Sequence, residues 1–135
     1  MKIRSTTAAG VELQTFGVSA AHLDSTTFWG WRKPFINGGI TLILPLGKAI
    51  VIIESRYLRK DAAGELIIDR QLALLRHELC HVQQGQDWGT LGYWRRHIWA
   101  RIKSRSMGAK ETDVERHCYE ALREVAAKHP VMLDA

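Results

Sequence analysis

The chain has 135 residues, of which 46% are hydrophobic and 24% charged, a composition typical of one globular domain with a hydrophobic core. No apolar run is long enough to span a bilayer, and no apolar segment follows the charged start, so we expect neither a transmembrane helix nor a signal peptide. The formal net charge of +5 permits an acidic partner without requiring one, because such a charge also serves solubility. We expect a cytoplasmic protein, or one exported without a conventional signal peptide.

The first half of the chain carries the strand signals. Residues 11–18 alternate between apolar and polar side chains, which predicts a half-exposed strand. Residues 19–39, rich in tryptophan and glycine, predict an irregular segment that ends in a turn. The apolar, β-branched runs 40–44 and 49–54 are separated by residues 45–48 (PLGK), and this pattern predicts a β-hairpin.

The second half carries the helix signals. After a short loop (DAAGE, 61–65), the sequence predicts three helices, at roughly residues 69–84, 90–104 and 111–128. Asp69 is the expected N-cap of the first helix, Gly85 is its stop signal, and Pro130 ends the third. Strands followed by helices predict an α+β domain over residues 1–135, with a small, mainly antiparallel sheet packed on the first helix.

The first predicted helix contains the motif HELCH, residues 77–81. His77 and His81 project together from one face, one turn apart, nearly opposite a stripe of leucines. Two imidazoles at this spacing suit a zinc ion, and Glu78 lies where it could reach a water on the metal without being a ligand. Solvated histidines on an ordinary helix are the alternative. The helix is apolar on both sides, however, and histidines buried without partners would be costly.

A catalytic zinc site needs a third protein ligand, and the third predicted helix offers several candidates. Glu115 projects onto the flank of its apolar face, where an unpaired carboxylate would be expensive to bury, so we expect it to bind the metal. Glu111 shares that face, but at the helix start it suits the helix dipole. His117, at the border of the face, is the main rival. Cys118 could bind zinc as a thiolate, but its place in the apolar stripe is typical of a core residue.

Residues 77–84 (HELCHVQQ), followed by a helix with residues 114–119 (VERHCY), resemble the gluzincin metallopeptidases, in particular their compact bacterial and phage-type versions. The resemblance covers roughly residues 40–128, and it implies a minimal zincin-like domain. It also implies the following roles: zinc ligands His77, His81 and Glu115, and catalytic base Glu78.

Two residues depart from the family pattern. Cys118 stands where a small residue such as alanine is common, and Tyr119 stands where larger gluzincins often place an aspartate that supports a ligand histidine. The chain has only one other cysteine, Cys80. Two cysteines are too few for a disulfide scaffold, and they suit a reducing compartment or reduced core positions.

These residues predict a zinc-dependent metallopeptidase that hydrolyses peptide bonds through a metal-activated water, with Glu78 as the general base. Such an enzyme also stabilises a tetrahedral oxyanion. Tyr93 and His97 share a polar stripe of the second helix and could donate a hydrogen bond there, although a solvated helix face explains the stripe as well. Tyr119, one turn beyond Glu115, is an equally good candidate for a hydrogen bond in the site.

A peptide or protein is the expected substrate. Either 40–44 or 49–54 could be an edge strand that pairs with an extended peptide. The aromatic segment 28–35 could wall the cleft, cover it as a lid or pack in the core. The basic run 93–105 could contact phosphates or an acidic membrane, but its cations point to several sides, so we favour a solvated, packed helix and do not expect nucleic acid.

Two other functions compete with a general peptidase. In one, the same fold acts on a single partner or a cell-wall peptide, or stays latent until it is activated. In the other, zinc is structural, and the protein is a binding module whose basic helix 93–105 holds nucleic acid or an acidic partner without peptidase activity. The oligomeric state is not predicted.

Overall fold

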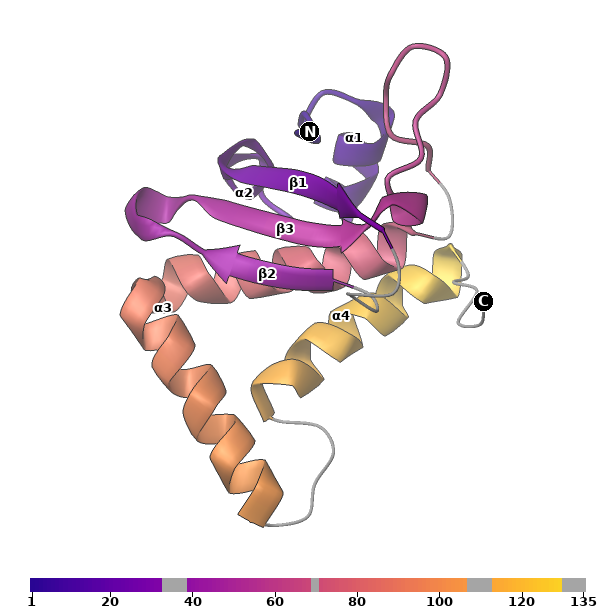
Figure 1. Cartoon of the computed structure of the whole chain (residues 1–135). Helices are drawn as coiled ribbons and strands as arrows, with labels where there is room; N and C mark the ends of the chain where they lie inside the picture. The colour runs from indigo at the N-terminus through magenta and orange to yellow at the C-terminus, as the bar shows by residue number, and fades with distance from the viewer. Residues whose placement is uncertain (33–38, 69–70, 107–112, 130–135) are drawn as a thin grey trace.

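The computed structural model of the chain describes residues 1–32, 39–68, 71–106 and 113–129. A three-stranded sheet lies along one side of a long, bent helix, α3, and the last helix, α4, packs on the inner side of the bend (Figure 1). Two short helices precede the first strand. This arrangement confirms the predicted α+β class. None of the described helices combines the length and the apolar character that a membrane crossing requires.

The predicted strand at 11–18 is wrong, because these residues belong to helix α1 (Ala8–Thr15) and the turn after it. Thr7 caps the helix, and its hydroxyl accepts a hydrogen bond from the backbone amide of the third residue after it. Ala9 and Leu13, one turn apart, are both fully buried. The buried positions therefore follow a helical period rather than the alternation of a strand.

The expected irregular segment 19–39 contains a helix and a strand. Ser19 caps α2 (Ala20–Ser25), and β1 (Thr26–Trp31) follows α2 directly. The prediction was wrong here because β1 owes its conformation to a distant partner strand, with which it pairs in parallel. The expected turn lies outside the described residues.

The predicted hairpin is confirmed: β2 (Gly39–Ile43) and β3 (Ala49–Glu54) pair antiparallel and are joined through the 3-10 turn η1 (Pro45–Gly47). β3 also pairs in parallel with β1, so the strand order is β1-β3-β2. The sheet is therefore mixed, with one antiparallel and one parallel pair of strands, and the predicted mainly antiparallel sheet is wrong in this detail because β1 joins β3 in parallel. Because β3 is central, 49–54 cannot be the edge strand that was considered for substrate binding, whereas β2 is an edge.

The segment after β3 is irregular, and the loop predicted at 61–65 is confirmed. A 3-10 turn, η2 (Ser55–Tyr57), is followed by the predicted loop at 61–65. A carboxylate oxygen of Asp61 accepts hydrogen bonds from the backbone amides of Ala63 and Glu65, at 2.9 and 3.0 Å. Asp61 thus closes the loop in the manner of an Asx turn.

Helix α3 (Leu72–Ser106) joins the first two predicted helices into one kinked element. The kink is at Gly89, whose φ of 74° and ψ of 166° are readily adopted only by glycine. The predicted stop at Gly85 is wrong, because this residue lies inside the helix. A Cβ there would come within 2.5 Å of the Ile43 side chain, so glycine allows α3 to pack closely on β2. The expected N-cap, Asp69, lies outside the described residues.

The first half of α3 is anchored in the main hydrophobic core. The predicted apolar stripe is buried there, and it comprises Leu72, Leu75, Leu79 and Val82. The sheet contributes Phe28, Val51 and Ile53 to the same cluster. Burial of one side chain of this kind contributes roughly 1.5–3 kcal/mol. The segment that carries the histidine motif is therefore held firmly against the sheet.

Helix α4 (Asp113–Lys128) corresponds to the third predicted helix, whose expected start at 111 and stop at Pro130 lie outside the described residues. Cys118 and Val125 are fully buried, two turns apart, as the predicted apolar face requires. At the other end, Lys128 Nζ lies 2.6 Å from a carboxylate oxygen of Glu12, which ties α4 to α1.

Candidate metal centre

The motif residues His77, Glu78 and His81 are all buried, because the first half of α3 lies between the sheet and α4. The two histidines occupy the side of α3 that faces α4, and their rings meet edge to face, with centroids 4.9 Å apart. Helical spacing of four residues brings both imidazoles to one point, as the sequence predicts.

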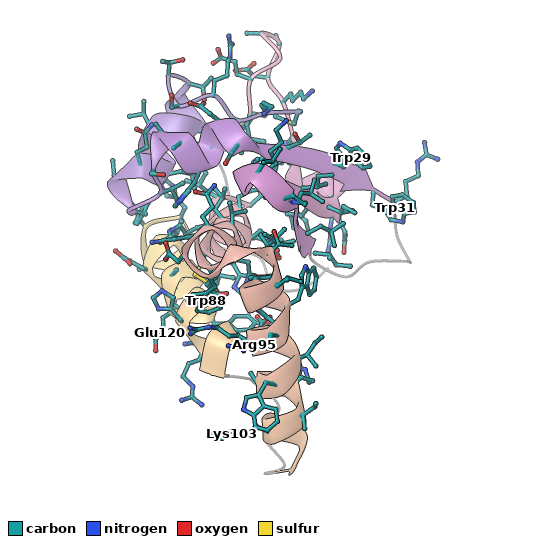
Figure 2. All side chains as sticks on the ribbon, turned by 90° about the vertical axis from the view of Figure 1, so that its left-hand side faces the viewer. Trp29, Trp31, Trp88, Arg95, Lys103 and Glu120 are labelled. Carbon is teal, nitrogen blue, oxygen red and sulfur yellow. A yellow bond between two sulfur atoms is a disulfide. The ribbon has the colours of Figure 1, made fainter. Side chains whose placement is uncertain are left out.

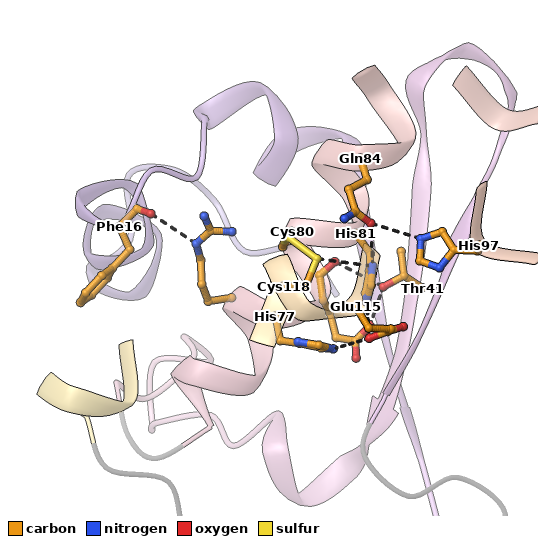
Figure 3. The surroundings of a disulfide bond; sticks show 11 residues. Phe16, Thr41, His77, Cys80, His81, Gln84, His97, Glu115 and Cys118 are labelled. Atoms are coloured by element: carbon orange, nitrogen blue, oxygen red, sulfur yellow. Dashed lines mark hydrogen bonds and ion pairs between the residues drawn. A yellow bond between two sulfur atoms is a disulfide. The ribbon is translucent and has the colours of Figure 1, made fainter. Parts of the chain in front are cut away.

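Glu115, on α4, completes the group (Figure 3). One of its carboxylate oxygens lies 3.6 Å from His77 Nε2 and 3.4 Å from His81 Nε2. One potential ligand atom from each of the three residues lies within 4.8 Å of the others. Two imidazole nitrogens and one carboxylate oxygen are a donor set that zinc uses in catalytic sites. The residues therefore fit a divalent metal ion.

The electrostatics of the group favour a cation between its members. Burial disfavours charge on His81, but the hydrogen bond and charge of Glu115 outweigh that effect and raise the pKa of His81. Burial likewise opposes charge on Glu115, yet the two histidines lower its pKa. Burial first, and then the neighbouring charge on His81, lower the pKa of His77. Protonation of His81 is therefore favoured, whereas protonation of His77 as well is disfavoured. A metal ion would supply positive charge to the three residues without any proton.

A disulfide between Cys80 and Cys118 joins the two helices directly behind the site (Figure 3). The expectation of two reduced core cysteines is therefore wrong. The two residues are 38 positions apart in the chain, and only the packing of α4 on α3 brings them together. Cys80 precedes His81, and Cys118 lies one turn after Glu115, so the bridge fixes the carboxylate relative to the imidazoles.

The structure also distinguishes Glu115 from the other candidates for the third metal ligand. His117 is exposed and does not join the group. Cys118 is bonded to Cys80, so it is not a free thiolate. Glu111 lies outside the described residues.

Gln84, one turn after His81, orients that histidine. Its side-chain carbonyl oxygen lies 3.0 Å from His81 Nδ1 and 3.2 Å from His97 Nε2 (Figure 3). A carbonyl oxygen only accepts, so each of these ring nitrogens donates to it. With its proton on Nδ1, neutral His81 presents the lone pair of Nε2 toward Glu115, as a metal ligand must.

His77 is supported differently. Its Nδ1 is buried and makes no hydrogen bond of ordinary geometry with the described residues. Burial lowers the pKa of His77, and the nearby backbone of Cys118 opposes this effect without reversing it. The Tyr119 ring packs on the His77 ring, with centroids 4.5 Å apart. Tyr119 therefore lies at the site, and its ring contact fixes the plane of the His77 imidazole.

Glu78 is held by the edge strand of the sheet. Thr41 Oγ1, on β2, donates a hydrogen bond of 2.6 Å to a carboxylate oxygen of Glu78. Burial raises the pKa of Glu78, and the Thr41 hydrogen bond and the charge of His81 offset this only in part. Thr41 was missed in the sequence, where its only signal is one polar residue at a buried position of an apolar strand.

Tyr93 and His97 come from the second half of α3 and reach the site from the side of Gln84. Their rings are 4.2 Å apart, and His97 is 5.2 Å from the His81 ring. Tyr93 is buried, which raises its pKa, as do the charges of Glu78 and Glu115. Burial, followed by the charge on His81, lowers the pKa of His97 to about 4, so its ring is neutral at physiological pH.

The aromatic segment 28–35 does not border the site in its described part. Phe28 is a core residue, whereas Trp29 and Trp31 are exposed on β1, the edge strand on the far side of β3 (Figure 2). Residues 33–35 lie outside the described residues.

Comparison of the chain with protein-family models, with curated proteins and with solved structures found no match.

Proposed function

We propose that the protein is a zinc-dependent metallopeptidase of the gluzincin type. The observation that carries this proposal is the convergence of His77, His81 and Glu115 beside the buried carboxylate of Glu78. Within the described residues this group offers three ligands, and a structural zinc site would need a fourth. Three ligands with an open position favour catalysis over the binding-module alternative.

The roles of the residues follow from their positions. When bound, zinc supplies Lewis acidity, which lowers the pKa of a water molecule and polarises a substrate carbonyl. Glu78 would accept a proton from the attacking water and would then pass it to the leaving nitrogen of the substrate. Its raised pKa suits both transfers, and Thr41 keeps its carboxylate oriented. Tyr93, His97 and Tyr119 remain the candidates for oxyanion stabilisation.

The position of β2 suggests how a peptide substrate binds. β2 is an edge strand, and its Thr41 contacts Glu78 directly. An extended peptide that adds to this edge would run beside the carboxylate, with its backbone hydrogen-bonded to the strand. The proposed substrate is therefore an extended segment of a peptide or protein.

The disulfide bears on where the enzyme works. Disulfides persist mainly in oxidising compartments, so the Cys80–Cys118 bridge favours export over a cytoplasmic location. We include export in the proposal.

The decisive experiment measures zinc and activity together. The purified protein is expected to bind one equivalent of zinc and to cleave members of a mixed peptide library, detected by mass spectrometry. Glu78→Gln keeps the oxygen that accepts from Thr41 but removes the base, so it should bind zinc normally and lose activity at least about 100-fold. Glu120→Gln, an exposed change on α4, is the matched control and should leave both unchanged.

Either of two results would contradict the proposal. One is failure of the folded protein to bind zinc when zinc is offered. The other is cleavage that persists in Glu78→Gln at the wild-type rate.

A further inference from the structure

The second half of α3, from Thr90 to Ser106, exposes an unusual number of large apolar side chains. The exposed fractions are 85% for Leu91, 67% for Trp99, 59% for Ile98 and 53% for Ile102. At 100° per residue, Leu91, Ile98 and Ile102 lie within about 40° of one another, with Trp94 and Trp99 on the two flanks. Tyr93 points the opposite way and is buried. This half of the helix therefore presents an apolar stripe, and the stripe faces away from the core.

The same half is strongly cationic. Residues 91–106 include five lysines and arginines and no aspartate or glutamate. Arg95 and Lys103 are exposed along this half (Figure 2). Arg96, also exposed, stacks its guanidinium on the Trp88 ring at 4.6 Å. Positive charge thus lies both within the apolar stripe, at Arg95, and beside it, and no acidic residue of the same segment offsets it.

We propose that the second half of α3 binds the surface of an anionic lipid bilayer. Helices that lie in the membrane interface combine an apolar face containing tryptophan and leucine with lysine and arginine on the polar face. Leu91, Ile98 and Trp99 enter the interface, while Arg95 and Lys103 extend to the lipid phosphates and carboxylates. Charge complementarity selects a membrane with acidic headgroups.

Other partners fit the same surface less well. Nucleic acid would pair its phosphates with the arginines but leave Leu91 and Ile98 in water. A second copy of the chain in a two-fold dimer would place the same cations opposite each other. A bilayer satisfies the apolar stripe and the cations together.

Docking would also orient the candidate metal centre. A pocket of about 310 Å³ lies between the stripe and the site, and its lining comprises Trp94, His97, Ile98, Arg101, Ile102 and Glu115. Three of these residues belong to the stripe or its flank. A bilayer against the stripe therefore places the pocket mouth at the membrane surface, where the substrate would be a membrane-proximal peptide segment. This consequence rests on the proposed peptidase function, whereas the docking itself does not.

Vesicle flotation tests the docking with the full chain. The protein should float with vesicles that contain about one third phosphatidylserine in phosphatidylcholine, but not with phosphatidylcholine alone, and the bound fraction should fall as salt is raised. Arg95→Gln/Lys103→Gln should weaken binding by roughly 25-fold, about fivefold for each cation. The matched control, Lys48→Gln/Lys60→Gln, removes two exposed cations elsewhere and should change binding less than twofold.

The apolar part of the contact has its own readout. Leu91→Ser should weaken vesicle binding at every salt concentration, because it removes the most exposed side chain of the stripe. Brominated lipid should quench the tryptophan fluorescence of the wild type, and Trp99→Phe should remove part of that quenching. An unchanged far-UV circular dichroism spectrum shows that each variant is folded.

Three outcomes would overturn the proposal. The first is no flotation with phosphatidylserine vesicles at low salt. The second is an equal effect of the two double substitutions. The third is that the protein does not bind vesicles but binds nucleic acid or forms a dimer, and that Leu91→Ser weakens this other interaction. None of these readouts uses peptidase activity, so they are independent of the proposed function.

Discussion

The two halves of α3 belong to one helix, yet they have opposite surroundings. From Leu72 to Gly85 almost every side chain is buried, including polar ones such as Gln84 and His81. Beyond the kink at Gly89, α3 runs away from the sheet (Figure 1). Large apolar side chains are exposed there instead. A helix takes its character from the elements packed around it, and here the change in direction at a single glycine removes one half from the sheet. The buried half holds the candidate metal centre, and the exposed half carries the surface proposed to bind lipid.

The largest expected effect is on the free energy of unfolding, and it is compared for one leucine substitution in each half of α3. Leu79→Ala, in the buried half, removes a core side chain and should lower the free energy of unfolding by about 2–5 kcal/mol. Leu91→Ala, in the exposed half, should change it by less than about 0.5 kcal/mol. Urea unfolding followed by circular dichroism measures both. Equal losses would mean that a partner or another part of the chain covers the exposed half in solution.

The disulfide should stabilise the buried half alone. Closing a loop of 38 residues by a disulfide contributes about 2–4 kcal/mol, so Cys80→Ser/Cys118→Ser should lower the free energy of unfolding by that amount. Zinc affinity should fall as well, because Glu115 is then held only by packing. Vesicle binding, which uses the other half, should not change.

Reduction of the wild type supplies the matched control for the disulfide. Treatment with a phosphine reductant should reproduce the stability and zinc affinity of the double serine variant and should leave that variant itself unaffected. Loss of vesicle binding on reduction would show that the two halves of α3 are coupled.

Local sequence signals predicted the elements that depend on few distant contacts. The β2–β3 hairpin follows from two β-branched runs around a turn sequence, and the His77/His81 pair follows from helical spacing. Glu115 was identified because a carboxylate on a core-facing flank needs a cation. In each case the sequence pattern that supports the prediction lies within a single helix or hairpin.

The wrong predictions concern residues whose local structure is determined by a contact with a distant part of the chain. Gly85 is a stop signal by local rules, but Ile43 of β2 requires a glycine there while the helix continues. β1 depends on its parallel pairing with β3, and the Cys80–Cys118 bridge depends on the docking of α4. Gln84 was within reach of the sequence, since it lies one turn after His81 on the same side of the helix. Its link to His97 required the bend at Gly89.

The smallest expected effect is on the pH dependence of stability and concerns His97. This residue belongs to the exposed half of α3 and contacts His81 and Gln84 of the buried half. The folded protein holds the pKa of His97 at about 4, chiefly through burial and then through His81, with Glu115 opposing and Arg101 adding to the effect. The unfolded chain has the ordinary value near 6.5. Between these two pKa values the unfolded state binds more protons at His97 than the folded state does. His97 therefore lowers the free energy of unfolding as pH falls from 6.5 to 4, and it has no such effect above pH 6.5. Because the side chain is only partly buried, solvent screening limits the loss to about 1–2 kcal/mol.

His97→Gln isolates this contribution, because glutamine can still donate to Gln84 but does not titrate. Stability measured by urea unfolding at pH 7 and at pH 5 should fall less in the variant than in the wild type, by about 1 kcal/mol. Titratable groups distant from His97 are common to both proteins, so their contributions cancel in the comparison. His81 contacts His97 and is coupled to it, so its share is part of the measured difference. An equal fall in both proteins would mean that His97 titrates as it does in the unfolded chain. The bend at Gly89 would then leave this ring in water instead of packing it against His81, and the two halves of α3 would meet only at the kink.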